Sequence, residues 1–152
     1  MTTLAAESRV ITGEPTPILL QDVADNGILR LTLNDATRRN ALSNEMMATL
    51  SQALDNAASD ANIRVIILAA NGPAFCAGHD LKQTSAGRDP DDKGLAFFPK
   101  VLTHPATLTP QIVNHPKPII AEVTGIATAA GCQLVASCDL AIAARSSKFA
   151  TP

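Results

Sequence analysis

The stretch PIIAEVTGIATAAGCQLVASCDLAIAA, residues 118–144, contains the alternation of elements that decides the fold. Residues 118–125 form an apolar run rich in β-branched side chains, which is typical of a buried strand. Residues 126–138 indicate a loop that enters a helix, and residues 139–144 return to an apolar strand. A strand, a helix and another strand in succession predict an α/β fold with a mainly parallel sheet.

The preceding part of the chain begins with a hairpin pattern. Residues 18–25 (ILLQDVAD) and 27–34 (GILRLTLN) flank an Asn-Gly dipeptide, a strong hairpin signal. After Ser43, a good N-cap residue, apolar side chains recur at helical spacing and predict a helix over 44–58. Residues 63–70 (IRVIILAA) predict another buried strand, followed by a loop.

The remaining segments are less regular. Residues 1–17 are interpreted as a flexible arm, and residues 18–152 as one domain. Residues 84–94 are polar and predict a mobile surface loop. Over 95–116 the apolar spacing favours a helix, but three prolines interrupt it.

Composition narrows the function classes. The net charge of −2 and the absence of Tyr and Trp argue against a nucleic-acid surface and against aromatic cages. No apolar run reaches the length of a membrane span, so neither nucleic acid nor membrane is an expected partner. Three cysteines without a C-x-x-C motif favour a reducing compartment, and the N-terminus is neither a secretory signal nor a good transit peptide. We therefore expect a cytoplasmic protein.

Two loops share a design that favours ligand binding. Residues 71–82 and 126–133 each follow a buried strand and pass through glycine and alanine before a polar side chain. Ligands usually bind at the carboxyl ends of parallel strands, and small residues leave backbone N–H groups accessible. A helix that begins near Ala129 would direct unpaired N–H groups into the same crevice. Two N–H groups that converge on one oxygen would form an oxyanion hole.

The same segments resemble a known family. AFCAGHDLK (74–82) and GIATAAGCQLVASCDLAIAA (125–144) are similar to the two signature segments of the enoyl-CoA hydratase/isomerase family, or crotonase superfamily. RRNALS (38–43) and HPKPIIAEVTG (115–125) fit its order and spacing. The resemblance covers roughly residues 18–152 and is strongest to the enoyl-CoA hydratase domain-containing subgroup. It implies repeated ββα units and a lyase or isomerase acting on an acyl-CoA thioester.

The resemblance also implies roles for individual residues. The N–H groups of His79 and Ala130 would hold the thioester oxygen, and Gln133 would lie beside the reacting carbons. Arginine and lysine suit the phosphates of coenzyme A, which is part of the substrate, so no separate cofactor and no metal are expected. The substrate-binding residues implied are Arg38, Arg39, Ala77, His79, Asp80, Leu81, Lys82 and Ala130.

Two departures from the family leave alternatives open. Hydratases of the family have a glutamate where this chain has Gln133, and an amide does not accept a proton at neutral pH. The family domain also continues past Pro152, with a second acid and with C-terminal helices that build trimers and hexamers. The chain is therefore interpreted as an N-terminal half. The alternatives to an enzyme are an acyl-CoA-binding pseudoenzyme and an inactive truncated product.

Other polar groups have competing interpretations. Cys76, His79 and Asp80 lie within five residues, but with no second cluster they make a weak metal site. Cys132, near a helix start, is a small packing residue or a thiol of lowered pKa, and packing is favoured. Glu122 lies inside a buried strand, where an ion pair or interface contact is favoured over a catalytic acid.

Overall fold

The computed structural model describes residues 16–86 and 107–151, and its strands form two sheets. The larger sheet contains, in spatial order, β1 (Leu19–Val23), β2 (Ile28–Leu33), β3 (Val65–Ala70), β5 (Ile119–Val123) and β7 (Leu140–Ala143). The smaller sheet contains β4 (Ala74–Cys76), β6 (Ile126–Thr128) and β8 (Lys148–Ala150). Only β1 and β2 pair antiparallel; all other neighbours are parallel. The predicted α/β fold with a mainly parallel sheet is confirmed.

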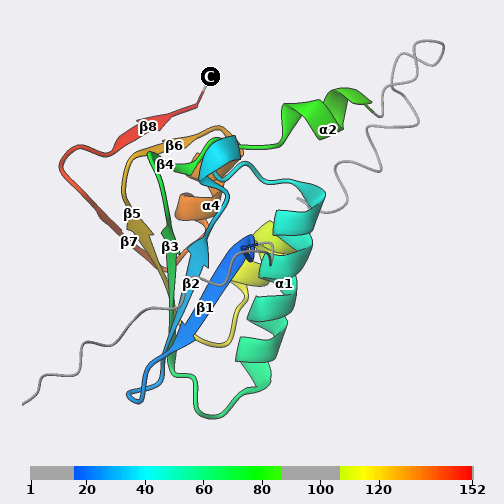
Figure 1. The fold of residues 1–152 in the computed structure, drawn as a ribbon. Helices are drawn as coiled ribbons and strands as arrows, with labels where there is room; N and C mark the ends of the chain where they lie inside the picture. Colours follow the sequence, from blue (N-terminus) through cyan, green and yellow to red (C-terminus); the bar gives the residue numbers. More distant parts are fainter. Residues whose placement is uncertain (1–15, 87–106, 152) are drawn as a thin grey trace, which may run out of the picture.

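The helices follow the strands in a repeated order. The helical elements with defined bounds are η1 (Ala36–Arg38), α1 (Asn44–Ser59), α2 (Leu81–Ala86) and α4 (Ala130–Ala136). β3 lies in the larger sheet and β4 in the smaller one before α2, and β5 and β6 repeat this arrangement before α4. These are the expected ββα units. Figure 1 shows α1 alongside β1 and β2, with β4, β6 and β8 together at the top of the view.

The core lies between α1 and the larger sheet. The Ser43 side chain accepts a hydrogen bond from the N–H of Met46 (3.1 Å) and caps the start of α1 as predicted. At the other end, the Lys117 ammonium donates to the carbonyls of Ala57 and Asp60. Between these ends, α1 buries its apolar face against the sheet: Met46, Met47, Leu50, Ala53, Leu54 and Ala57. The helix is therefore fixed at both ends and along one side.

Some local predictions were wrong. The loop predicted over 71–82 contains β4 and the start of α2, and the loop predicted within 126–138 contains β6. Three-residue strands are too short to produce a detectable alternation. Residues 107–113 are helical although Pro110 lies among them. The flexible arm, apart from residues 16 and 17, and most of the polar and proline-interrupted segments lie outside the described residues.

Glu122 forms an ion pair, which was the favoured interpretation. Its carboxylate accepts two hydrogen bonds from the Arg30 guanidinium across β3, at 2.9 and 2.5 Å. These contacts hold the pKa of Glu122 below its ordinary value. Both side chains remain about two-fifths exposed, so water screens the pair and its contribution to stability is small. Among the described helices, none is long and apolar enough to cross a membrane.

Candidate active site

The two loops with the predicted N–H donors meet at Gly78. A Cβ atom built on Gly78 would lie 3.1 Å from the Cβ of Ala129 and 3.4 Å from the backbone nitrogen of Ala130. The φ angle of Gly78 is +92°, a conformation that side chains disfavour. The structure thus brings the residue before His79 into contact with the start of α4.

The His79 N–H is left available by a short parallel bridge. The Leu42 N–H donates to the Gly78 carbonyl (2.7 Å), and the Asp80 N–H donates to the Leu42 carbonyl (3.2 Å). Adjacent residues of an extended strand direct their N–H groups to opposite sides, so the His79 N–H points away from Leu42. Within the described part of the chain, no acceptor for the His79 N–H is present.

The Ala130 N–H is available because it begins a helix. N–H groups of a first helical turn have no partner within the helix. The Ala129 carbonyl accepts from the N–H groups of Cys132 (3.0 Å) and Gln133 (3.2 Å), which starts the helical ladder. Ala129 itself has φ 50° and ψ −121°, a strained conformation for a residue with a Cβ atom. Strain of this kind is concentrated at functional sites, where the surrounding structure enforces it.

All three residues predicted to be catalytic line one cavity. Its lining consists of Leu42, Met47, His79, Leu108, Thr109, Ala130, Gln133 and Leu134. The cavity volume is about 10 Å³, which is room for about one water molecule. Most of the lining is apolar, and Gln133 also reaches the surface.

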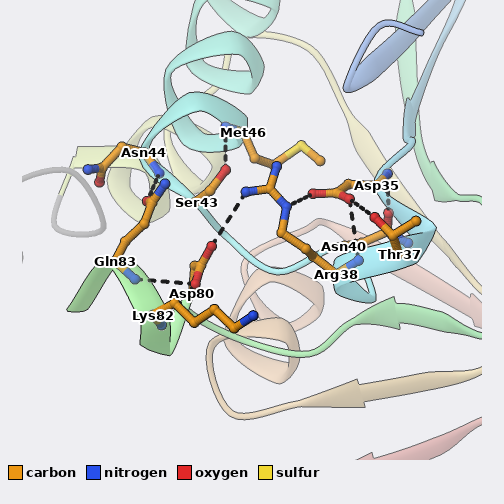
Figure 2. Close-up of polar contacts among 10 residues, drawn as sticks. All are labelled: Asp35, Thr37, Arg38, Asn40, Ser43, Asn44, Met46, Asp80, Lys82 and Gln83. Carbon is orange, nitrogen blue, oxygen red and sulfur yellow. Dashed lines mark hydrogen bonds and ion pairs between the residues drawn. The ribbon is translucent and has the colours of Figure 1, made fainter. Parts of the chain in front are cut away.

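The guanidinium of Arg38 is exposed but is already paired with two carboxylates. Its Nε lies 2.6 Å from Asp35 and its Nη1 lies 3.5 Å from Asp80. Figure 2 shows the guanidinium between these two acids. The neighbouring Arg39 is exposed, and its side chain forms no hydrogen bond or ion pair with the described residues. Of the two predicted phosphate ligands, Arg39 has the side chain more available for a phosphate.

Asp80 has a structural role. Its carboxylate accepts hydrogen bonds from the N–H groups of Lys82 (3.0 Å) and Gln83 (3.4 Å), which caps the start of α2 (Figure 2). The Gln83 side chain in turn accepts from the N–H of Asn44 (2.9 Å), where α1 begins. Leu81 and Lys82 are exposed on the first turn of α2. Asp80 thus fixes the turn that presents them.

Asn40 was not predicted to contribute to the site. Its side chain is fully buried and accepts from the Asp35 N–H (2.8 Å). It also donates to the carbonyls of Asn71 and Ala74, each at 2.8 Å. One amide thereby joins the loop after β2 to the loop before β4. The only sequence signal was that the polar run TRRN (37–40) ends at Asn40, before the apolar Ala41 and Leu42, which also fits a surface loop.

The sulfur atoms near the site are packing groups. Cys76 is fully buried, and burial raises its pKa to about 11, so the thiolate that a metal requires is disfavoured. The Cys132 thiol lies 3.0 Å from the Ala127 carbonyl oxygen, to which it donates a hydrogen bond, in agreement with the packing interpretation. Among the described residues, no three His, Cys, Asp or Glu side chains lie close enough to hold a metal ion.

Comparison with known proteins identifies the family. The model of the enoyl-CoA hydratase/isomerase family matches residues 23–152. The chain belongs to this family. Enoyl-CoA hydratase domain-containing protein 3, mitochondrial, from Xenopus laevis is 42% identical over 98% of this chain and 50% of its own length. 1,2-Epoxyphenylacetyl-CoA isomerase from Escherichia coli is 35% identical over 82% of this chain and 47% of its own length.

Solved structures of this family share the fold. An enoyl-CoA hydratase from Mycobacterium smegmatis has a TM-score of 0.81 and 46% identity, covering 88% of this chain and 50% of its own. The human enoyl-CoA hydratase domain-containing protein 3 has a TM-score of 0.80 and 40% identity, and the match covers 90% of this chain and 51% of the human chain. The crotonase-like fold and the resemblance to this subgroup are confirmed. The chain spans about half the length of the curated relatives that it matches.

The expectation of a cytoplasmic protein was wrong. Five vertebrate relatives, 41–43% identical to this chain, are named as mitochondrial proteins. A low cysteine count indicates a reducing compartment, and the mitochondrial matrix satisfies that condition as well as the cytoplasm does. The N-terminal segment, on which the expectation also rested, did not distinguish the cytoplasm from mitochondria. The names of these relatives therefore contradict the expected cytoplasmic location.

Proposed function

We propose that this family member binds an acyl-CoA thioester and stabilises an enolate-like intermediate with the N–H groups of His79 and Ala130. The supporting observation is the contact of Gly78 with Ala129 and Ala130, which draws the two donor loops together. Two fixed donors aimed at one oxygen stabilise the negative charge that develops there. Loss of one such donor typically costs about 3–4 kcal/mol of transition-state stabilisation.

The proposed coenzyme A contacts come from two segments. The exposed Arg39 would pair with a phosphate, because Arg38 is already paired with Asp35 and Asp80. Leu81 and Lys82, on the exposed first turn of α2, would contact the rest of the coenzyme. Assembly into trimers or hexamers stays a prediction from the family resemblance.

Gln133 limits the reactions that this site would perform. The amide would position a water or a carbonyl by hydrogen bonds, and it does not accept a proton. No carboxylate among the described residues lines the cavity. Isomerisation, hydrolysis or decarboxylation is therefore favoured over hydration, and the same feature keeps the acyl-CoA-binding pseudoenzyme as a second candidate.

Gly78→Ala is expected to abolish thioester polarisation. The added methyl group would lie 3.1 Å from the Ala129 Cβ atom and 3.2 Å from the Thr128 carbonyl oxygen, and it would require an unfavourable φ angle, so the two donors would separate. The probe is a cinnamoyl-CoA with an electron-donating para substituent, whose absorption moves to longer wavelength when its carbonyl is polarised. We expect a clear red shift with the unmodified protein and at least about tenfold weaker thioester binding in the variant.

Gly72→Ala is the matched control for this experiment. Gly72 has a similar φ of +89°, and its added methyl group would meet the side chain of Ala36 instead of the donor loops. Circular dichroism establishes that both variants are folded at the assay temperature. A red shift retained in Gly78→Ala, or lost equally in Gly72→Ala, would contradict the proposed oxyanion hole.

A further inference from the structure

The imidazole of His79 has a buried nitrogen without a partner. Its Nε2 atom is the only buried side-chain nitrogen or oxygen without a hydrogen bond in the part of the chain that the structure describes. Buried polar atoms in folded proteins are almost always paired. Because His79 lines the cavity with Ala130 and Gln133, a molecule bound there is the natural partner of Nε2.

The surroundings of the ring favour its neutral form. Leu42, Met47, Leu108 and Leu134 supply most of the cavity wall, and no other lining residue among those described titrates. Burial lowers the pKa of the His79 imidazole from its ordinary value of 6.5. At neutral pH the ring therefore has a lone pair available to accept a proton.

We infer that the His79 imidazole moves the α-proton of the bound acyl-CoA, as a further catalytic group in the site proposed above. The Nε2 lone pair takes the proton, so the bond from the α-carbon to hydrogen breaks and an N–H bond forms. The electron pair passes to the thioester oxygen, where the N–H groups of His79 and Ala130 hold the negative charge. Return of the proton restores neutral imidazole.

This inference assigns two tasks to one residue. The backbone N–H of His79 would stabilise the thioester oxygen, and its imidazole would take the proton from the neighbouring α-carbon. It also supplies the proton acceptor that Gln133 lacks. Return of the proton to the α-carbon gives exchange with solvent, and its return to the γ-carbon of an enoyl thioester gives isomerisation. The inference rests on the proposed function, but a side-chain substitution separates the two.

His79→Ala removes the imidazole and keeps the backbone N–H. The measurement is deuterium incorporation at the α-carbon of butyryl-CoA in D2O, followed by proton NMR. We expect the exchange rate to fall by about 100-fold or more in this variant, the usual contribution of a positioned acid–base group. The red shift of the bound cinnamoyl thioester is expected to persist, because the oxyanion donors remain.

Two further variants separate proton transfer from packing. His79→Gln keeps a hydrogen-bonding side chain but does not accept a proton at neutral pH, so it is expected to lose α-proton exchange as His79→Ala does. His115→Gln is the matched control, because the His115 ring bonds the Leu54 carbonyl (3.0 Å) and does not line the cavity. In the unmodified protein the exchange rate should rise with pH, and the midpoint of this rise should lie below 6.5, the ordinary imidazole pKa.

Three results would overturn the inference. If His79→Ala exchanges at the unmodified rate and keeps the red shift, the proposed oxyanion hole stands and the catalytic imidazole does not. If the unmodified protein produces the red shift without any exchange, the imidazole moves no proton. If neither signal is present in the unmodified protein, the proposed function fails and the inference fails with it.

Discussion

Gly131→Ala is expected to lower the free energy of unfolding by about 3 kcal/mol or more. Gly131 lies in the first turn of α4, against β4. A methyl group there would lie 2.3 Å from the Cys76 carbonyl oxygen and 3.0 Å from the Cys76 Cβ atom. The oxygen belongs to the backbone, so rotation of a side chain does not relieve the contact. Urea denaturation followed by circular dichroism measures the loss.

The control for this substitution is Ala136→Ser in the same helix. Ala136 is exposed at the end of α4, and one added oxygen there meets solvent. Its expected change in the free energy of unfolding is within about 0.5 kcal/mol. If Ala136→Ser lowers the free energy of unfolding as much as Gly131→Ala does, α4 tolerates an added atom at neither position. Contact with β4 is then not the cause of the destabilisation.

Asn40→Ala is expected to cost about 3–5 kcal/mol of stability. The substitution removes two buried hydrogen bonds and one that is partly buried, and it leaves the Asp35 N–H and the carbonyls of Asn71 and Ala74 without that partner. Each unsatisfied buried group costs about 1–3 kcal/mol. The Asn40 backbone also has φ 53°, which asparagine tolerates better than alanine does. Denaturation in urea gives the change directly.

Asn62→Ala is the corresponding control for Asn40→Ala. Asn62 is exposed in a turn, and among the described residues its side chain donates only to Asp60 (3.1 Å). Its loss is expected to be about 0.5 kcal/mol or less. If Asn40→Ala costs no more stability than Asn62→Ala, solvent or neighbouring groups satisfy the freed backbone atoms. The amide would then not be what joins the two loops.

The main elements of the fold could be predicted from the sequence because their signals are local. The hairpin followed from Asn26-Gly27, and α1 followed from Ser43 and the apolar spacing after it. The short strands β4 and β6 were missed, since three residues give no measurable periodicity. Strand β7 was predicted, but all four of its residues are exposed.

The site was predictable only to the extent that its residues belong to recognisable segments. The loops containing His79 and Ala130 were identified from their small residues and from the resemblance, and the structure brings them together. The hydrogen bonds that Asn40 donates to Asn71 and Ala74 span more than 30 residues, and the pair of Arg30 with Glu122 spans 92. Contacts between such distant residues leave no local pattern, so only the folded chain reveals them.

In the proposed site, two backbone N–H groups hold one thioester oxygen. The most direct measurement is a ¹⁵N–¹H NMR titration of the amides of His79 and Ala130 with butyryl-CoA, with free coenzyme A as the control. We expect both amide protons to move downfield together with butyryl-CoA and to stay in place with coenzyme A. If both amides remain unchanged while butyryl-CoA binds, or if coenzyme A produces the same shifts, the two N–H groups do not hold the thioester oxygen.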